Sequence, residues 1–166
     1  VLPGVDDALA RLKAAGFALV VVTNQPDVAR GRQTAAVVNA MHDRLAALFS
    51  LRDATGDAQA TGGHRLPARW VIHTVGPVWR GGDAAEAELL ASCYARALAV
   101  ADELGATSVA FPAISTGVYG FPRDEAATIA VDTVRSTPTA VRRVLLVAFD
   151  AATAGLYTER LADRTP

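Results

Sequence analysis

The stretch Ser115-Thr116-Gly117-Val118-Tyr119-Gly120-Phe121-Pro122 separates an expected strand from an expected helix. It follows the apolar run Val109 to Ile114, which is typical of a buried strand. It precedes Arg123-Asp124-Glu125-Ala126-Ala127, a pattern that indicates the first turn of a helix. A strand that gives way to small residues and then to a helix exposes several backbone N–H groups in one place. Such groups can hold a phosphate or diphosphate without a charged side chain.

The residue types within and just after this stretch suit such a loop. Gly117 and Gly120 allow a positive φ and a close approach of the backbone to a ligand. Pro122 suits a first helical position, and Asp124 and Glu125 favour the positive end of a helix dipole. An ordinary turn between a strand and a helix would show the same spacing. The residues alone therefore leave both interpretations open.

Composition limits the possible classes of protein. The 166 residues, 51% of them hydrophobic, suffice for one domain with a sizeable core. A net charge of −1 gives no basic field, so no nucleic-acid partner is expected. The single cysteine, Cys93, excludes an internal disulfide and favours a cytoplasmic location, and no apolar run is long enough to cross a membrane. Because the chain begins at Val1, we expect a fragment or a processed product.

Apolar runs alternate with helical patterns along the chain. The expected strands are Phe17 to Val22, a short one between turns at Thr55 to Ala58 and Gly62-Gly63, Trp70 to Val75, Val109 to Ile114, and Val144 to Phe149. This alternation predicts one α/β domain over residues 1–166, with three α/β/α layers and a mostly parallel sheet of about four to five strands. The carboxyl ends of the strands then share one edge, which gathers Thr23-Asn24-Gln25, Gly76-Pro77, Ser115-Thr116-Gly117 and Asp150.

From about Arg52 onward, several blocks of sequence resemble the macrodomain family. The blocks are Thr55-Gly56-Asp57-Ala58, Leu66 to Pro77 (LPARWVIHTVGP), Leu89 to Tyr94 (LLASCY) and Ala110 to Gly120 (AFPAISTGVYG). The resemblance implies a fold that binds ADP-ribose. It also implies that the loop Ser115 to Tyr119, and with it Gly120, wraps the diphosphate and distal ribose. The strand end Phe149-Asp150 would then lie beside the adenosine.

The first fifty residues resemble a different family, the haloacid dehalogenase superfamily, in its histidinol-phosphate and heptose-bisphosphate phosphatase branch. The matching segments are Leu2-Pro3-Gly4-Val5, Leu9 to Lys13 (LARLK), Val21-Val22-Thr23-Asn24-Gln25 and Ala29-Arg30-Gly31. In that family the threonine matching Thr23 contacts the transferred phosphate. We therefore expect a chimera, in which a phosphatase-like segment of residues 1–50 replaces the start of a macrodomain and the Thr23 strand pairs beside the strands ending at Ser115 and Gly76.

Both resemblances are incomplete where catalysis would take place. The phosphatase branch needs a paired-aspartate motif, and no Asp-x-Asp occurs in the chain. The segments that carry the catalytic asparagine and aspartate in hydrolytic macrodomains have no counterpart. Asn24 and Asp27 are the remaining weak candidates for positioning water, and Arg30 is a candidate for contacting an anionic ligand.

Three functions remain open. The first is a module that binds ADP-ribose or a related small nucleotide without efficient catalysis. The second is a recombined or engineered fold with no ligand. The third is a weak hydrolase of ADP-ribosyl or phosphate esters. No cofactor and no metal site are expected, because no spacing links the three histidines, and the sequence does not decide the oligomeric state.

Overall fold

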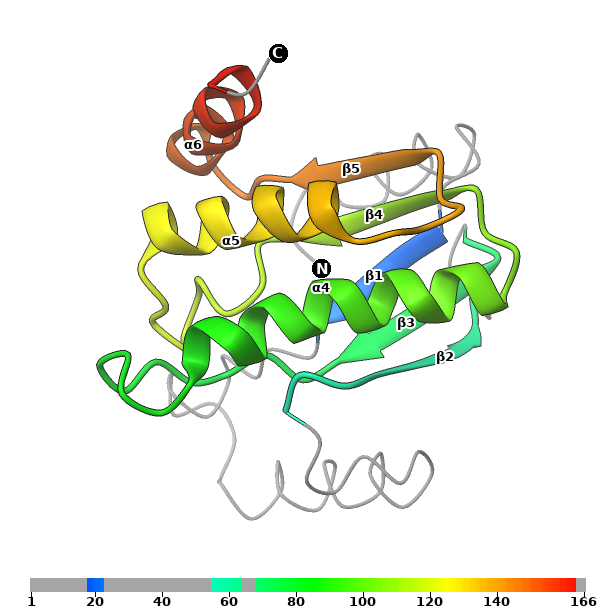
Figure 1. The fold of residues 1–166 in the computed structure, drawn as a ribbon, viewed down its shortest axis with the longest axis horizontal. Coiled ribbons are helices and arrows are strands. Elements are labelled where there is room, and N and C mark those ends of the chain that lie inside the picture. The colour runs from blue at the N-terminus through cyan, green and yellow to red at the C-terminus, as the bar shows by residue number, and fades with distance from the viewer. Residues whose placement is uncertain (1–17, 23–54, 64–67, 164–166) are drawn as a thin grey trace.

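The computed structural model describes residues 18–22, 55–63 and 68–163, which form a five-stranded sheet with three helices (Figure 1). The strands are β1 (Ala18–Val22), β2 (Ala58–Gly62), β3 (Trp70–Thr74), β4 (Ser108–Pro112) and β5 (Arg143–Val147). The strand predictions are thus confirmed to within one or two residues at most ends. Apolar residues at helical spacing also predict a helix from Thr34 to Ser50. This helix and the candidates Thr23, Asn24, Asp27 and Arg30 lie outside the described residues.

The strand order in the sheet is β2-β3-β1-β4-β5. β1 is parallel to both of its neighbours, with Leu19 opposite Val71 of β3 and opposite Ala110 of β4. β5 is parallel to β4, and β2 alone runs antiparallel, against β3. The mostly parallel sheet is therefore confirmed. Parallel strands end at the same edge of a sheet, so the carboxyl ends of β3, β1 and β4 lie side by side.

The helices are α4 (Glu86–Glu103), α5 (Arg123–Ser136) and α6 (Ala151–Ala162). Figure 1 shows α4 and α5 on the same face of the sheet, with α6 against α5 beyond β5. Pro122 was expected at the first helical position but stands one residue earlier. Its φ of −56° and ψ of 124° are not helical, and its carbonyl accepts the first helical hydrogen bond from Ala126.

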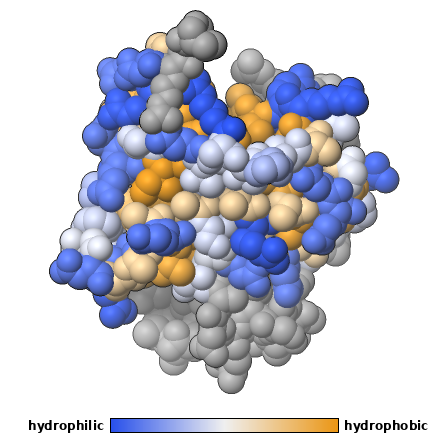
Figure 2. All heavy atoms as spheres, in the orientation of Figure 1, coloured by the Kyte–Doolittle hydropathy of each residue, from blue (hydrophilic) through white to orange (hydrophobic). Residues whose placement is uncertain are grey.

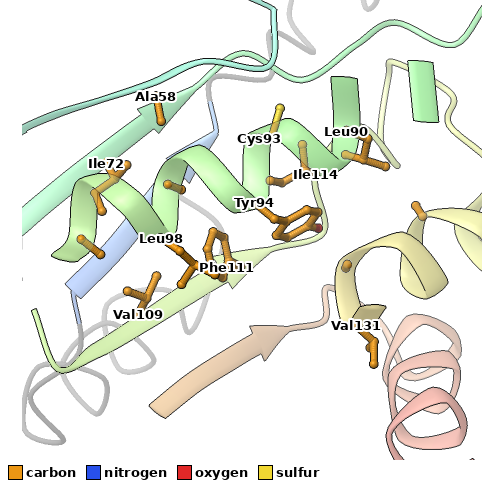
Figure 3. Close-up of a cluster of buried hydrophobic side chains, with 14 of the residues drawn as sticks. Ala58, Ile72, Leu90, Cys93, Tyr94, Leu98, Val109, Phe111, Ile114 and Val131 are labelled. Atoms are coloured by element: carbon orange, nitrogen blue, oxygen red, sulfur yellow. The ribbon is translucent and has the colours of Figure 1, made fainter. Parts of the chain in front are cut away.

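The core lies between α4 and strands β3 and β4 (Figure 3). Small and aromatic side chains recur along one face of α4 because residues three and four positions apart share a face. The ring of Tyr94 packs against that of Phe111 in β4, with centroids 5.1 Å apart. The buried residues of α4 are Glu86, Leu90, Cys93, Tyr94, Ala97, Leu98, Val100 and Ala101.

The surface seen from the helix side is mainly hydrophilic on the outward faces of the helices, with hydrophobic residues in the seams between them (Figure 2). β5 is an edge strand of the described sheet, and its side chains alternate between exposed and half-buried positions. Leu145 and Val147 on its outer side are 38% and 39% exposed. Within the ranges given above, no helix is both long and apolar enough to cross a membrane.

Candidate functional site

The carboxyl edge of the sheet brings together three segments that are far apart in the sequence. β1 lies between β3, which leads to Gly76, and β4, which leads to Ser115. This confirms that the strand ending just before Thr23 pairs beside the strands that end near Gly76 and Ser115. The roles of Thr23, Asn24, Asp27 and Arg30 stay predictions, because these four residues lie outside the described ranges.

The stretch from Ser115 to Phe121 is a compact loop closed by its own backbone. The N–H of Phe121 donates to the carbonyl of Ser115 at 3.0 Å, and the N–H of Gly120 donates to the carbonyl of Gly117 at 3.0 Å. Positive φ values occur at Ser115 (62°) and Gly120 (69°). The expectation of a positive φ at Gly117 was wrong. The loop instead has a positive φ at Ser115, and this backbone conformation costs free energy in a residue other than glycine.

The middle of this loop presents backbone donors to the surroundings. Among the hydrogen bonds of the described residues, none uses the backbone N–H of Gly117, Val118 or Tyr119. Gly117 is exposed, and Val118 has 40% of its surface exposed. Three successive N–H groups that have no acceptor among the described residues, just before the start of α5, are the kind of backbone donors that bind anions.

Gly76 lies directly against this loop from the end of β3. A methyl group at Gly76 would lie 2.3 Å from Ser115 Oγ and 2.8 Å from Ile114 Cγ2, so only glycine fits there. The Ser115 side chain is buried, and its Oγ has no hydrogen-bond partner among the described residues. The sequence marked Gly76 only as the end of a strand, because the close approach depends on the pairing of β3, β1 and β4.

Trp79 connects the next segment of chain to the loop. Its backbone N–H donates to the carbonyl of Tyr119 at 2.9 Å, and its ring contacts that of buried Phe121, with centroids 4.7 Å apart and planes inclined by 56°. Tyr119 is half-buried, and this burial raises the pKa of its phenol. Its hydroxyl is therefore uncharged at neutral pH and adds no repulsion toward an anion.

Glu86, at the start of α4, is a buried carboxylate that the sequence analysis missed. Its Oε1 accepts from the N–H of Arg80 at 2.9 Å and of Gly82 at 3.4 Å, and its Oε2 accepts from the N–H of Ala84 at 2.7 Å. Burial raises the pKa of Glu86, but the bonds from its own N–H and from these three outweigh it, so the pKa lies below its ordinary value. The sequence signal is limited to an acidic residue in the first turn of a helix, a position that the exposed Glu88 also occupies.

Asp150 has structural partners at the carboxyl end of β5. Its Oδ1 accepts from the N–H of Thr153 at 2.8 Å and caps α6, and its Oδ2 accepts from Arg123 at 2.8 Å. The capping bond is the largest cause of its lowered pKa. Phe149 is 81% exposed. A place for these two residues beside an adenosine stays a prediction.

Other titratable side chains in the described residues have structural surroundings. Burial lowers the pKa of His73, whose Nε2 lies 2.9 Å from Thr61 Oγ1. Burial also raises the pKa of Cys93, whose thiol donates to the carbonyl of Val75 at 3.4 Å. In the ranges that the structure covers, no three His, Cys, Asp or Glu side chains gather as a metal site would require.

The chain belongs to the macro domain family, whose model matches residues 35–130. It is 56% identical over 107 residues to a macro domain-containing protein of Streptomyces coelicolor, covering 64% of this chain and 63% of the relative. It is 53% identical over 110 residues to the O-acetyl-ADP-ribose deacetylase of Klebsiella pneumoniae, covering 64% of this chain and 63% of that enzyme. The chain thus spans less than two thirds of the length of these relatives.

Solved macrodomain structures share the fold. The Oceanobacillus iheyensis macrodomain with ADP superposes with a TM-score of 0.69 at 31% identity, covering 88% of this chain and 83% of that chain. The G37V mutant of the same macrodomain with ADPR gives a TM-score of 0.67 at 32% identity, covering 87% and 84%. These likenesses confirm the three-layer α/β fold class.

The comparisons correct the expected boundary of the macrodomain segment. The family match begins at residue 35, so residues 35–51 lie inside the macro domain match rather than in a phosphatase-like segment. The expected helix from Thr34 to Ser50 resembled the phosphatase branch only through motifs that precede it. The comparisons lend no support to a chimera with a junction near residue 52.

Proposed function

We propose that this chain binds ADP-ribose or a related nucleoside diphosphate at the loop from Ser115 to Gly120. The observation that carries the proposal is the row of backbone N–H groups at Gly117, Val118 and Tyr119, which no described residue accepts from. An anion that receives these three hydrogen bonds gains charge-assisted interactions, and the nearby amino end of α5 adds a favourable dipole.

Two further features support a nucleotide diphosphate rather than free phosphate. The loop lies at the carboxyl edge of a parallel sheet, where ligands of open α/β folds bind, and β1 at its centre leads to further polar residues. In addition, ADP and ADPR are the molecules named with the O. iheyensis structures that share this fold. The diphosphate would bridge the loop donors, and the sugars and base would extend along the edge.

The test is a calorimetric titration of the protein with ADP-ribose beside the variant Gly117→Glu. Gly117 is exposed and has no positive φ, so a glutamate there leaves the backbone unstrained but puts a negative side chain at the anion position. Gly155→Glu is the matched control, because a side chain at Gly155 in α6 meets nothing within 4 Å. Saturable binding in the parent and in Gly155→Glu, with none in folded Gly117→Glu, would support the proposal.

A parent protein that melts cooperatively but gives no heat with ADP-ribose would contradict the proposal. It would favour the alternative of a fold without a ligand. Binding that survives unchanged in Gly117→Glu would instead place the ligand elsewhere.

Hydrolysis of ADP-ribosyl esters is the second candidate function, and the likeness to the K. pneumoniae deacetylase favours it. Asn24 and Asp27 remain the candidates for positioning water in a weak hydrolase. Both candidates rest on the sequence alone. Incubation of the same protein with O-acetyl-ADP-ribose, followed by chromatography, separates binding from turnover. The phosphatase-like origin was expected for residues 1–50, of which residues 1–34 precede the family match, and it stays a prediction there. The role of Arg30 and a cytoplasmic location also stay predictions.

A further inference from the structure

A buried carboxylate lies at the start of α4, and its hydrogen-bond donors among the described residues are backbone groups outside the candidate loop. Glu86 is 2% exposed, and both of its carboxylate oxygens accept hydrogen bonds from the backbone of the segment over residues 80–84. That segment has no regular hydrogen bonding of its own. It carries positive φ values at Gly81 (123°) and Gly82 (96°), and Ala85, which caps α4, has a φ of 57°. Its shape therefore depends on the carboxylate that it surrounds.

The same segment packs against the ring of Trp79 at Gly82. A methyl group at Gly82 would lie 3.1 Å from Cη2 of Trp79, so the backbone at Gly82 is already close to the indole. The ring of Phe121 contacts the indole as well, at 4.7 Å between centroids. Trp79 thus has the Gly82 backbone and the Phe121 ring as neighbours. The N–H of Gly82 in turn donates a hydrogen bond to the Glu86 carboxylate.

Trp79 in turn contacts the carboxyl end of the candidate loop, at Tyr119 and at Phe121 just after it. Its backbone N–H donates to the carbonyl of Tyr119, and the N–H of Tyr119, one peptide group earlier, is one of the three donors without an acceptor among the described residues. Phe121, against its ring, closes the loop through the bond from its N–H to the carbonyl of Ser115. The orientation of the peptide groups around Tyr119 therefore depends on where Trp79 lies.

We propose that Glu86 is a positioning residue for the anion-binding loop, acting through the segment over residues 80–84 and Trp79. This inference rests on the proposed function of the loop, but the mechanical link does not require that a ligand bind. Removal of the charge loosens the segment and frees Trp79. The peptide group between Tyr119 and Gly120 then loses its fixed direction, and the preceding peptide group, which carries the Tyr119 N–H, shifts with it. Affinity for a diphosphate then falls although no residue of the loop has changed.

The first experiment uses the free protein and so does not depend on ADP-ribose. Amide hydrogen exchange is followed by mass spectrometry in the parent, in Glu86→Gln and in Glu88→Gln, where Glu88 is an exposed acidic residue in the same helical turn. We expect at least a severalfold faster exchange in the peptide over residues 115–121 of Glu86→Gln alone, through the Gly120 and Phe121 amides, which have acceptors within the loop. Exchange in β4 and β5 should be unchanged. Equal exchange over residues 115–121 in all three proteins would overturn the proposal, whatever the protein binds. Faster exchange everywhere would show a general loss of stability and would also count against it.

A second pair of variants tests whether the segment over residues 80–84 acts on the loop through its contact with Trp79. Gly81→Ala and Gly82→Ala carry the same kind of backbone strain, because both glycines have positive φ. Only the methyl at Gly82 meets Trp79, whereas a methyl at Gly81 meets nothing within 4 Å. Gly82→Ala should therefore speed exchange over residues 115–121 more than Gly81→Ala, and equal effects would contradict the role of Trp79.

The titration with ADP-ribose then measures the consequence for binding. Loss of a charged hydrogen-bonding partner typically changes an equilibrium constant about tenfold, so we expect Glu86→Gln to weaken binding by about that factor and Glu88→Gln to leave it unchanged. Unchanged affinity in a Glu86→Gln protein with faster loop exchange would overturn the positioning role. No binding in the parent would refute the proposed function while leaving the exchange result valid.

Discussion

Replacement of Gly76 by alanine tests how closely β3 and the candidate loop are fitted together. The added methyl group would lie 2.3 Å from Ser115 Oγ and 2.8 Å from Ile114 Cγ2, whereas side-chain carbons essentially never approach closer than 3.0 Å. The neighbours must therefore retreat by at least 0.7 Å at the first contact, the difference between 3.0 and 2.3 Å. Ser115 and Ile114 are both fully buried and have little space to do so.

Overpacking of this kind costs about 1–3 kcal/mol of the free energy of unfolding. For a domain of this size each kcal/mol lowers the melting temperature by about 2–4 °C, so we expect a decrease of about 2–12 °C. Gly76 does not have a positive φ, so the cost arises from the contact and not from the backbone conformation. The same displacement of Ser115 should weaken binding of ADP-ribose.

Thermal unfolding followed by circular dichroism measures the effect, with Gly62→Ala as the matched control. Gly62 also ends a strand and is exposed, and a methyl there meets nothing within 4 Å. We expect Gly62→Ala to melt within about 2 °C of the parent, since surface changes rarely exceed 0.5 kcal/mol. If Gly76→Ala melts together with Gly62→Ala, the close approach of β3 to the loop is not present in the protein.

Two further substitutions test other parts of the site. Phe121→Ala should lower the free energy of unfolding, measured in urea, by about 3–5 kcal/mol because the ring is buried against Trp79. Phe149→Ala is the control and should change this free energy little, since the ring is 81% exposed. Similar urea midpoints for the two variants would contradict the packing of Phe121. The pKa of Asp150 lies below its ordinary value of 3.8, so its carboxylate stabilises the fold fully above that pH, and the stabilisation is lost as pH falls through the folded-state pKa. Asp150→Asn should therefore lose less stability than the parent between pH 7 and pH 3, and an equal loss in both would refute the assignment.

The sheet could be predicted from the sequence because its strands carry local signals. The valine-rich run that became β1 and the run that became β4 are continuous and apolar, as strands buried on both faces must be. The position of β1 between β3 and β4 was also expected, but from the resemblance to a macrodomain and not from a local signal. β5 was expected as a further apolar strand, but its edge position follows only from the pairing of the whole sheet.

The details of the site could not be predicted because they depend on contacts between distant segments. A serine with a positive φ is rare, so nothing local identifies Ser115, and the two glycines nearby seemed better suited to it. Gly76 and Trp79 contact the loop across a gap of about forty residues. Glu86 resembled an ordinary acidic residue of a first helical turn, and its burial and its three backbone donors, which the sequence does not show, distinguish it from Glu88.

The central place of β1 has a consequence for folding during synthesis. β1 is made first of the five strands, yet its neighbours follow much later: Val71 lies 52 positions after its partner Leu19, and Val109 lies 91 positions after its partner Ala18. At synthesis rates of about 5–20 residues per second, β1 waits roughly 5–20 s for β4 to be made. During that time the apolar, β-prone segment of β1 lacks the partner strand that β4 later provides. The nascent chain should therefore depend on the ribosome or a chaperone to shield β1 until the sheet can close around it.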